Sequence, residues 1–278
     1  MLKNELYDLF IEHSNSQHLG PKYPIYIPSK ARPKCVTGNL FKAAGLNYLI
    51  VVEPQDYEEY VKVHDASNIL VMDKNDQGIH YVRNFCKIHS KDFKSHWQFD
   101  DNIRSFKVRE NEKNIISDSA AMIRKVESFI DLFDNVGICG FSHDVFAWTK
   151  DNVIDLNKQC YSGVLVNNTI DIWWRDEVVE DTDYSLQVLS NNYCTLLFNT
   201  LLIAKETTKK GNGGNDNSDD WRMKRSLGLQ RYWPEAGFKI THEFGRVKVK
   251  PSQIWKKFKQ MPRGKTFDLN SNDLSAFF

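Results

Sequence analysis

The stretch HWQFDDN, residues 96–102, decides how this sequence is interpreted. Its first half, residues 96–99, is expected to form a short buried strand that runs directly into Asp100, Asp101 and Asn102. Carboxylates that directly follow such a strand should emerge at the rim of the core rather than at an arbitrary place on the surface. The stretch therefore predicts an acidic group at the carboxyl end of a strand in a sheet.

Strands and helices are expected to alternate before this stretch. Apolar runs predict strands at residues 23–28, 48–52 and 68–72, and the segments between them predict helices at 37–44, 57–64 and 78–90. Such alternation with short loops is typical of a doubly wound α/β sheet, in which ligands bind at the carboxyl ends of the strands. The features expected at those ends are the loop 29–32, Glu53, Asp73 and the Asp100–Asp101 pair.

The pattern continues after the acidic stretch and predicts one domain. A helix is expected at 117–133, strands at 136–141, 163–166 and 194–203, and a further helix at 182–190. The segment 209–220, KKGNGGNDNSDD, predicts a loop because Gly, Asn and Asp dominate it. We therefore expect an N-terminal helix and loop at 1–22, a single α/β domain with a mixed sheet flanked by helices at 23–250, and a basic C-terminal tail at 251–278.

The composition is typical of a soluble globular protein. Hydrophobic residues make up 41% of the 278 residues and charged residues 26%, which argues against a disordered chain. The 37 basic and 36 acidic side chains nearly cancel, so the overall charge does not indicate a nucleic-acid-binding protein. Contact with a polyanion would have to come from a local cluster, such as Lys256, Lys257 and Lys259 in the tail. A solvated surface is the alternative interpretation of that cluster.

Cysteine usage and hydropathy predict the compartment. The five cysteines are scattered and never spaced as Cys-x-x-Cys, which argues against a zinc module and a disulfide framework and favours a reducing compartment. The N-terminus lacks the apolar core of a signal peptide, and no run approaches 18 apolar residues. We therefore expect a cytoplasmic protein with no membrane partner.

Asp100 and Asp101 are candidate ligands of a divalent cation. Adjacent carboxylates repel each other and raise each other's pKa unless a cation relieves them. Mg²⁺ or Mn²⁺, bound between a carboxylate and the diphosphate of a nucleotide, would supply that relief and neutralise charge on a departing diphosphate. Asn102 is a weaker, neutral ligand, and His242 is the best further ligand that the sequence offers. An aspartate-rich turn without a metal is the alternative.

Acidic residues also open the helix expected at 182–190. Glu180, Asp181 and Asp183 exceed what capping a helix requires, so one of them could accept a proton from an acceptor hydroxyl. Interaction with the helix dipole alone is the alternative. Trp173 and Trp174, just before these acids, could stack on a base or a sugar, and ordinary packing is the alternative for at least one of them.

In chain order, several segments together resemble the TET-associated glycosyltransferases of bacteriophages. They are residues 27–32, 51–54, 78–84, 97–103 and 175–189, then Lys205 with 207–208, and finally 213–215, 233–235 and 244–246. The most specific are EDTDYSLQ at 180–187 and the Gly-Gly-Asn triplet at 213–215. The resemblance implies the GT-A fold and the addition of a sugar to an oxidised pyrimidine in DNA, such as 5-hydroxymethylcytosine.

The resemblance also implies roles for individual residues. The donor, a UDP-sugar, would contact Ser29, Lys30, Arg32, Glu53, Arg83, Asp100, Gly213, Gly214 and Asn215. Glu53 would lie near the uracil, Arg83 near the diphosphate and Asp100 near the ribose. Mg²⁺ or Mn²⁺ would be held by Asp101, with Asn102 and His242 as further ligands. Glu180 or Asp181 would face the acceptor, and Asp181 matches the catalytic-base position of inverting GT-A enzymes. Trp173 and Trp174 remain the candidate acceptor contacts from the residues themselves.

One departure from the GT-A pattern and three alternatives accompany this hypothesis. Asn102 stands at the third position of the usual Asp-x-Asp motif, which leaves Asp101 as the expected main metal contact. The same fold could act on a protein or a glycan instead of DNA. The carboxylates could also belong to a metal-dependent nuclease, although no catalytic Lys or His accompanies them in the sequence. A non-catalytic nucleotide-binding module is the third alternative.

Overall fold

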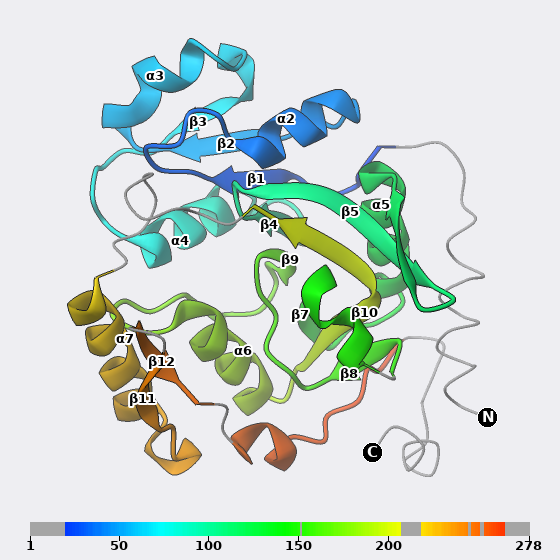
Figure 1. Ribbon diagram of the computed structural model, residues 1–278, viewed down its shortest axis with the longest axis vertical. Helices are drawn as coiled ribbons and strands as arrows, with labels where there is room; N and C mark the ends of the chain where they lie inside the picture. The colour runs from blue at the N-terminus through cyan, green and yellow to red at the C-terminus, as the bar shows by residue number, and fades with distance from the viewer. Residues whose placement is uncertain (1–19, 151, 207–217, 244–245, 251–252, 265–278) are drawn as a thin grey trace.

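A mixed β-sheet forms the centre of the computed structural model, which describes residues 20–150, 152–206, 218–243, 246–250 and 253–264 (Figure 1). Within these residues ten strands share the sheet, in the order β3-β2-β1-β4-β9-β7-β10-β5-β6, with β8 also paired to β10. The strands are β1 (Ile25–Pro28), β2 (Leu49–Val52), β3 (Ile69–Val71), β4 (Ser95–Phe99), β5 (Ile103–Glu110), β6 (Lys113–Ser117), β7 (Val136–His143), β8 (Ile154–Leu156), β9 (Gly163–Asn167) and β10 (Cys194–Lys205). Strands β3, β2, β1 and β4 are parallel, so their carboxyl ends meet at one edge.

Helices cover both faces of this sheet. The longer ones are α2 (Val36–Ala43), α3 (Tyr57–Val61), α4 (Ile79–His89), α5 (Ser119–Ile130), α6 (Glu180–Ser190) and α7 (Asp219–Tyr232). Phe41 of α2 and Phe129 of α5 pack in one core cluster with Trp97 of β4. On the opposite face, Cys86 of α4 packs against β1 and β2, and Val188 of α6 packs against β7 and β9. Along the chain, helices on one face (α2 and α5) alternate with helices on the other (α4 and α6), which matches the expected α/β class.

The period-2 geometry of β4 determines which of its side chains can reach the helices. Successive strand residues point to opposite faces of a sheet. Trp97 and Phe99 stack with their ring centroids 5.2 Å apart, and the Trp97 indole N–H donates to Glu127 of α5 at 2.9 Å. His96 and Gln98 therefore project toward the face covered by α4. The strand that anchors the core on one side thus supplies polar groups on the other.

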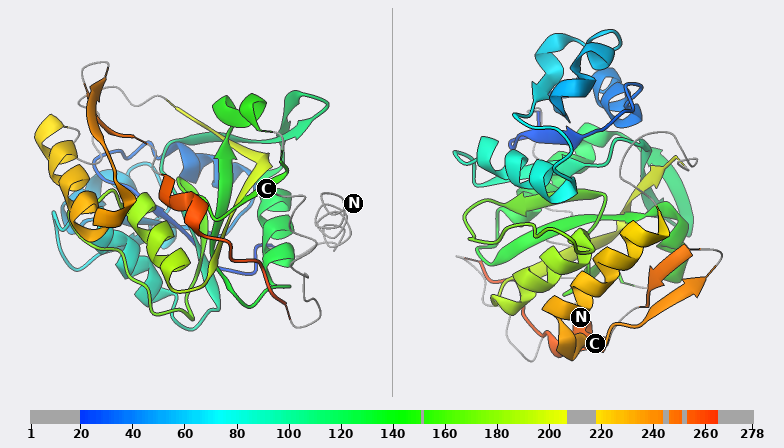
Figure 2. Two further views of the ribbon diagram at one scale, coloured as in Figure 1. Left: turned by 90° about the horizontal axis from the view of Figure 1, so that it is seen from below. Right: turned by 90° about the vertical axis from the view of Figure 1, so that its left-hand side faces the viewer.

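A second layer lies outside α6. Leu229 of α7 packs with Leu186 of α6 and with Ile254 of the short helix η6 (Gln253–Lys257), and Figure 2 shows the order α7, α6 and sheet. A Cβ atom on Gly228 would lie 1.9 Å from the Glu177 carbonyl oxygen, so only glycine permits this close approach of α7. The hairpin of β11 (Ile240–Glu243) and β12 (Arg246–Val249) lies beside α7. The described part of the expected basic tail therefore packs on the domain through Ile254.

The predicted strands and helices in the first half of the chain are confirmed within a few residues. The elements that were not predicted include the β5–β6 hairpin, strands β8 and β12, and helix α7. The expected loop at 209–220 is wrong at its end, because the Ser218 side chain accepts a hydrogen bond from the Trp221 amide and starts α7 at Asp219. The expected N-terminal helix and residues 213–215 lie outside the described residues. Among the helices that the structure describes, none is long and apolar enough to cross a bilayer.

Candidate active site at the carboxyl ends of the strands

Asp101, which follows β4, is enclosed by residues of the loop after β1. The Ser29 hydroxyl donates to Asp101 Oδ2 at 2.8 Å, and Arg32 Nη1 donates to Asp101 Oδ1 at 3.1 Å. Only 7% of the Asp101 side chain is exposed. Burial raises the pKa of Asp101, while Arg32 and Ser29 act in the opposite direction. Both carboxylate oxygens of Asp101 thus accept a hydrogen bond from the loop after β1.

Lys30 and Glu53 form a second contact at the same edge. The Lys30 ammonium donates to Glu53 at 2.9 Å and to Asp76 at 2.5 Å, and Glu53 is buried at the end of β2. Gln55 donates to the other Glu53 oxygen at 2.6 Å. The structure therefore brings together the donor-binding residues expected at the ends of β1 and β2, although they are separated in the chain. Asp73, expected at the same edge, accepts a hydrogen bond from Tyr81.

Asp100 faces away from the β1 loop, toward the end of β10. Lys205, the last residue of β10, is ion-paired with Asp100, and its ammonium also donates to the Ser162 hydroxyl at 3.2 Å. Burial opposes ionisation of Asp100, yet Lys205 and Arg83 hold its pKa below the ordinary value. With 31% of its side chain exposed, Asp100 is the more accessible of the two adjacent aspartates.

Arg83 of α4 links the two acids that open α6. Its Nη2 lies 3.2 Å from Asp181 Oδ1 and 3.8 Å from Glu180 Oε1. Burial raises the pKa of Asp181, Arg83 and Lys205 lower it, and the charge of Asp100 raises it. The charges of Asp100 and Asp181 therefore lie close enough to influence each other.

A chain of buried hydrogen bonds fixes Arg83 from behind. Gln98 accepts from Arg83 Nη1 at 3.1 Å and donates to the Arg83 carbonyl at 3.0 Å, so its amide holds both ends of that residue. The Gln98 amide nitrogen lies 2.7 Å from His96 Nε2, and His96 Nδ1 lies 2.6 Å from Asn168 Oδ1. Burial lowers the pKa of His96 to about 3. A neutral ring that donates through Nδ1 and accepts through Nε2 satisfies every one of these contacts.

Arg225 of α7 was not anticipated from the sequence. It is ion-paired with Glu180, and its Nε donates to the Val178 carbonyl at 2.5 Å. Burial lowers the pKa of Arg225 to about 10. The signal that could have revealed this helix was Ser218 followed by two acids, a common start of a helix.

Asp183 has a structural environment that separates it from Asp181. It is fully buried, ion-paired with Arg175, and accepts hydrogen bonds from the Trp233 indole and from Gln187, each at 2.8 Å. These contacts explain the third acid of the cluster by packing, whereas Asp181 retains 24% exposure of its side chain.

The two candidate acceptor tryptophans differ in environment. Trp174 is buried and stacks on Tyr184 of α6 with ring centroids 4.0 Å apart. Trp173 is 41% exposed, and the Lys87 ammonium lies 4.8 Å from its ring centroid. Packing thus accounts for Trp174, which is the alternative that the sequence left open for one of the two. Trp173 is the tryptophan whose ring is accessible to an acceptor.

The remaining candidate metal ligands show no shared cluster. The Asn102 side-chain amide donates to the Glu206 carbonyl at 3.0 Å. His242 is exposed on β11, in the hairpin beside α7. In the part of the chain that the structure describes, no group of three His, Cys, Asp or Glu residues is arranged to hold a metal ion. Among the described residues, Asp100 and Asp101 therefore have no third such side chain to share a cation with.

Comparison with known proteins identifies the family and a similar fold. A family model described as TET-Associated Glycosyltransferase matches residues 23–214. Among solved structures, the chain is similar to the mannosyltransferase PcManGT from Pyrobaculum calidifontis, solved in complex with GDP-Man and Mn²⁺. That likeness has a TM-score of 0.52 at 9% sequence identity and covers 85% of this chain and 76% of the other. It shows the fold, which is the expected GT-A-like α/β fold. No curated protein sequence matches the chain.

Proposed function

Because the chain belongs to the TET-associated glycosyltransferase family, we propose that it transfers a sugar from a UDP-sugar to the hydroxymethyl group of 5-hydroxymethylcytosine in DNA. The observation that carries this proposal is the convergence of Asp100, Arg83 and Asp181 at the carboxyl ends of the parallel strands. A donor-side carboxylate and a base for the acceptor are the two groups that such a transfer needs.

The contacts support one orientation of the donor across this edge. The uridine would lie at the β1 and β2 ends, where Ser29, Lys30 and Glu53 gather. Since Asp101 contacts Ser29 and Arg32 there, it is the aspartate nearer the ribose, and Asp100 is the one nearer the diphosphate and the sugar. This exchanges the two roles that the family resemblance implies. Residues 213–215 stay a sequence-based expectation for the phosphates.

The acidic pair fits a divalent cation that is bound together with a diphosphate. Carboxylate oxygens are the ligands that Mg²⁺ and Mn²⁺ prefer, and one or two of them plus substrate phosphates commonly suffice. Around the centre, the carboxylates of Asp100, Asp101, Glu180 and Asp181 face the cations of Lys205, Arg32, Arg83 and Arg225. A diphosphate added to this balanced set brings excess negative charge. When bound at Asp100 or Asp101, the cation would neutralise that charge on the leaving group.

Asp181 is the proposed catalytic base. Its carboxylate would accept the proton of the hydroxymethyl group while the oxygen forms a bond to the anomeric carbon and the bond to the diphosphate breaks. Glu180 is held by Arg225 and Arg83, so it would orient the site rather than take the proton. Arg83 would stay beside Asp181 throughout, because Gln98 fixes it from the sheet.

The acceptor base would have to leave the DNA duplex to reach Asp181, at a cost of about a few kcal/mol. Contacts to the phosphates would offset that cost. Lys256, Lys257 and Lys259 are exposed on or just after η6 and are the proposed phosphate-binding residues. Their joint replacement by Ala should flatten the dependence of DNA binding on salt concentration, because fewer counterions are released. An unchanged salt dependence would remove them from this role.

The experiment that tests the function compares different acceptors with each donor in turn. The protein is incubated with each of several UDP-sugars and Mn²⁺, and UDP release is measured with hydroxymethylcytosine DNA, unmodified DNA, a peptide mixture and a glycan mixture. The proposal predicts acceptor-dependent UDP release with hydroxymethylcytosine DNA alone. Release stimulated by peptides or glycans would instead support the same fold acting on a protein or glycan, which the formal net charge of +1 favours.

A further inference from the structure

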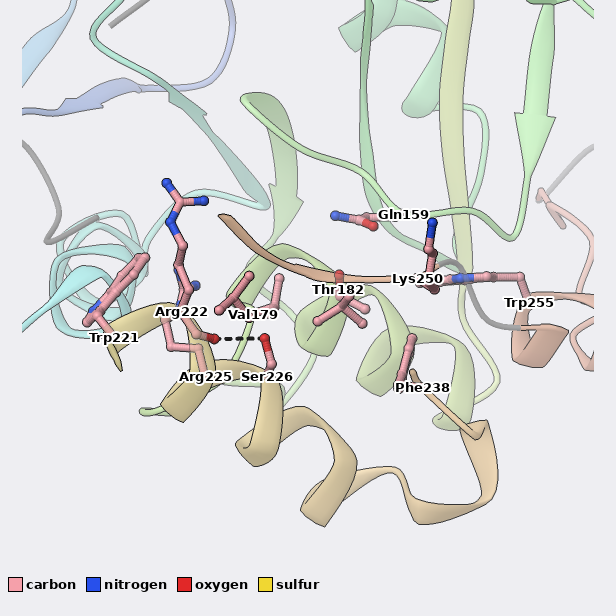
Figure 3. Close-up of a pocket in the computed structure, with 12 residues that line it drawn as sticks. Gln159, Val179, Thr182, Trp221, Arg222, Arg225, Ser226, Phe238, Lys250 and Trp255 are labelled. Atoms are coloured by element: carbon pink, nitrogen blue, oxygen red, sulfur yellow. Dashed lines mark hydrogen bonds between the residues drawn. The ribbon is translucent and has the colours of Figure 1, made fainter. Parts of the chain in front are cut away.

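A pocket of about 360 Å³ lies between α6 and α7 (Figure 3). It is bounded by the start of α6, by α7, by the β11–β12 hairpin and by η6. Pockets that hold small ligands span roughly 300–1,000 Å³, so this pocket is near the lower end of that range and has room for about one nucleotide. Nine of its twelve lining residues come after position 214, where the family match ends.

The lining combines aromatic rings with cations. Trp221 of α7 and Trp255 of η6 stand at opposite sides of the pocket in Figure 3. Arg222 and Lys250 supply positive charge, and no Asp or Glu is among the lining residues, although Lys250 is ion-paired with Glu243 of β11 beside the pocket. Aromatic side chains stack on nucleobases, and Arg and Lys contact the flanking phosphates. This chemistry matches a nucleotide better than it matches a neutral sugar or an acidic peptide.

The pocket shares a wall with the proposed catalytic centre. Arg225 lines it, lies 4.2 Å from the Trp221 ring centroid, and is ion-paired with Glu180. Thr182, one residue after Asp181, lines it as well. A ligand in the pocket would therefore lie against the first turn of α6, the turn that also carries Asp181.

We propose that this pocket binds the acceptor nucleotide, with the base stacked on Trp221 and a neighbouring phosphate bound by Lys250. The inference rests on the proposed function, since it assigns a place to the acceptor of that same reaction. It makes the chain after residue 214 the part that selects the acceptor, while the strand ends bind the donor.

Steady-state kinetics of two matched pairs of variants test the proposal. Trp221→Ala is compared with Trp148→Ala, an indole that is 73% exposed on η4 (Asp144–Thr149) and outside the pocket. Lys250→Ala is compared with Lys239→Ala, whose backbone carbonyl accepts the Lys250 amide across the hairpin but whose side chain is outside the pocket. Acceptor KM is measured with a hydroxymethylcytosine oligonucleotide at saturating UDP-sugar, and donor KM at saturating oligonucleotide.

The expected result is a rise of about tenfold in acceptor KM for Trp221→Ala, the loss of one stacked base, and a smaller rise for Lys250→Ala. Donor KM and both control variants should stay at the wild-type values. Acceptor KM values equal to those of the controls, or a rise in donor KM instead, would overturn the pocket assignment and leave the proposed function intact. If the wild-type protein glycosylates a peptide or glycan and no DNA, the function and the pocket assignment both fail.

Discussion

The guanidinium of Arg83 lies 3.2 Å from the carboxylate of Asp181, and the amide of Gln98 binds that arginine through both its side chain and its carbonyl. The position of the proposed base is therefore set by the central sheet through one buried cation. Packing of α4 and α6 on the same face of the sheet makes this contact possible. The predictions below follow from this arrangement.

Replacing Asp181 by Asn should remove the base without removing the donor site. General bases typically contribute about 10²–10⁴-fold to rate, so kcat should fall by at least about a hundredfold. The affinity for UDP should be unchanged, which titration calorimetry would measure. The matched control is Glu177→Gln, which should keep full activity. Glu177 lies in the loop before α6, its side chain is 39% exposed, and it pairs with Lys224 of α7. Full activity of Asp181→Asn would contradict the assignment.

Replacing Arg83 by Gln should shift the pH dependence of the reaction. Burial raises the pKa of Asp181 and Arg83 opposes that rise, so loss of the arginine should raise the pKa further. Because the base must be ionised, the acidic limb of kcat/KM should move to higher pH. Arg83→Lys keeps the charge and should move the limb less. An acidic limb that stays in place in both variants would exclude Arg83 as the group that tunes the base.

Replacing Lys205 by Met should strengthen metal binding in the absence of nucleotide. The ammonium of Lys205 is ion-paired with the Asp100 carboxylate, and a metal ion that binds this carboxylate has to displace the ammonium. Ion pairs that are partly exposed contribute up to about 1 kcal/mol, so the affinity for Mn²⁺ should rise by up to about fivefold. Lys30→Met, which releases Glu53 instead, is the control. Equal Mn²⁺ affinity in wild type and Lys205→Met would argue against Asp100 as a ligand.

His96 should make the protein less stable in acid. Its folded pKa is about 3, below the ordinary value of about 6.5, so the unfolded chain binds the proton more readily between these values. The stabilising contribution of the neutral ring is thus present above about pH 6.5 and is lost as the pH falls toward 3. Between pH 7 and pH 5 the free energy of unfolding should fall by about 1–2 kcal/mol less in His96→Gln than in wild type, as measured by urea unfolding at each pH. An identical pH dependence in both proteins would show that His96 takes up its proton in the folded protein at the same pH as in the unfolded chain.

The sequence predicted which residues meet at the proposed donor-binding edge because short-range patterns determine that grouping. Apolar runs identify β1, β2 and β4, and parallel pairing then brings Ser29, Glu53 and the aspartates to one edge whatever lies between them. The same argument explains why the strand assignments agree with the structure in this half of the chain.

Partners from distant parts of the chain could not be predicted in this way. Lys205 is 105 residues from Asp100, and only the pairing of β10 with β5 brings it to the site. Helix α7 carries charged residues around its circumference, so it lacks the apolar stripe by which helices are recognised in a sequence. The difference between Asp181 and Asp183 depends on Arg175 and Trp233, which no local pattern relates to them.

Mass spectrometry of nucleosides tests the central claim most directly. Hydroxymethylcytosine DNA is incubated with wild-type protein, Mn²⁺ and a panel of UDP-sugars, digested to nucleosides and compared with the same reaction run with Asp181→Asn. We predict that wild type yields a nucleoside heavier by one sugar residue with at least one donor, and that the variant yields almost none. Unchanged hydroxymethylcytosine with every donor, or equal product from the variant, would contradict the account.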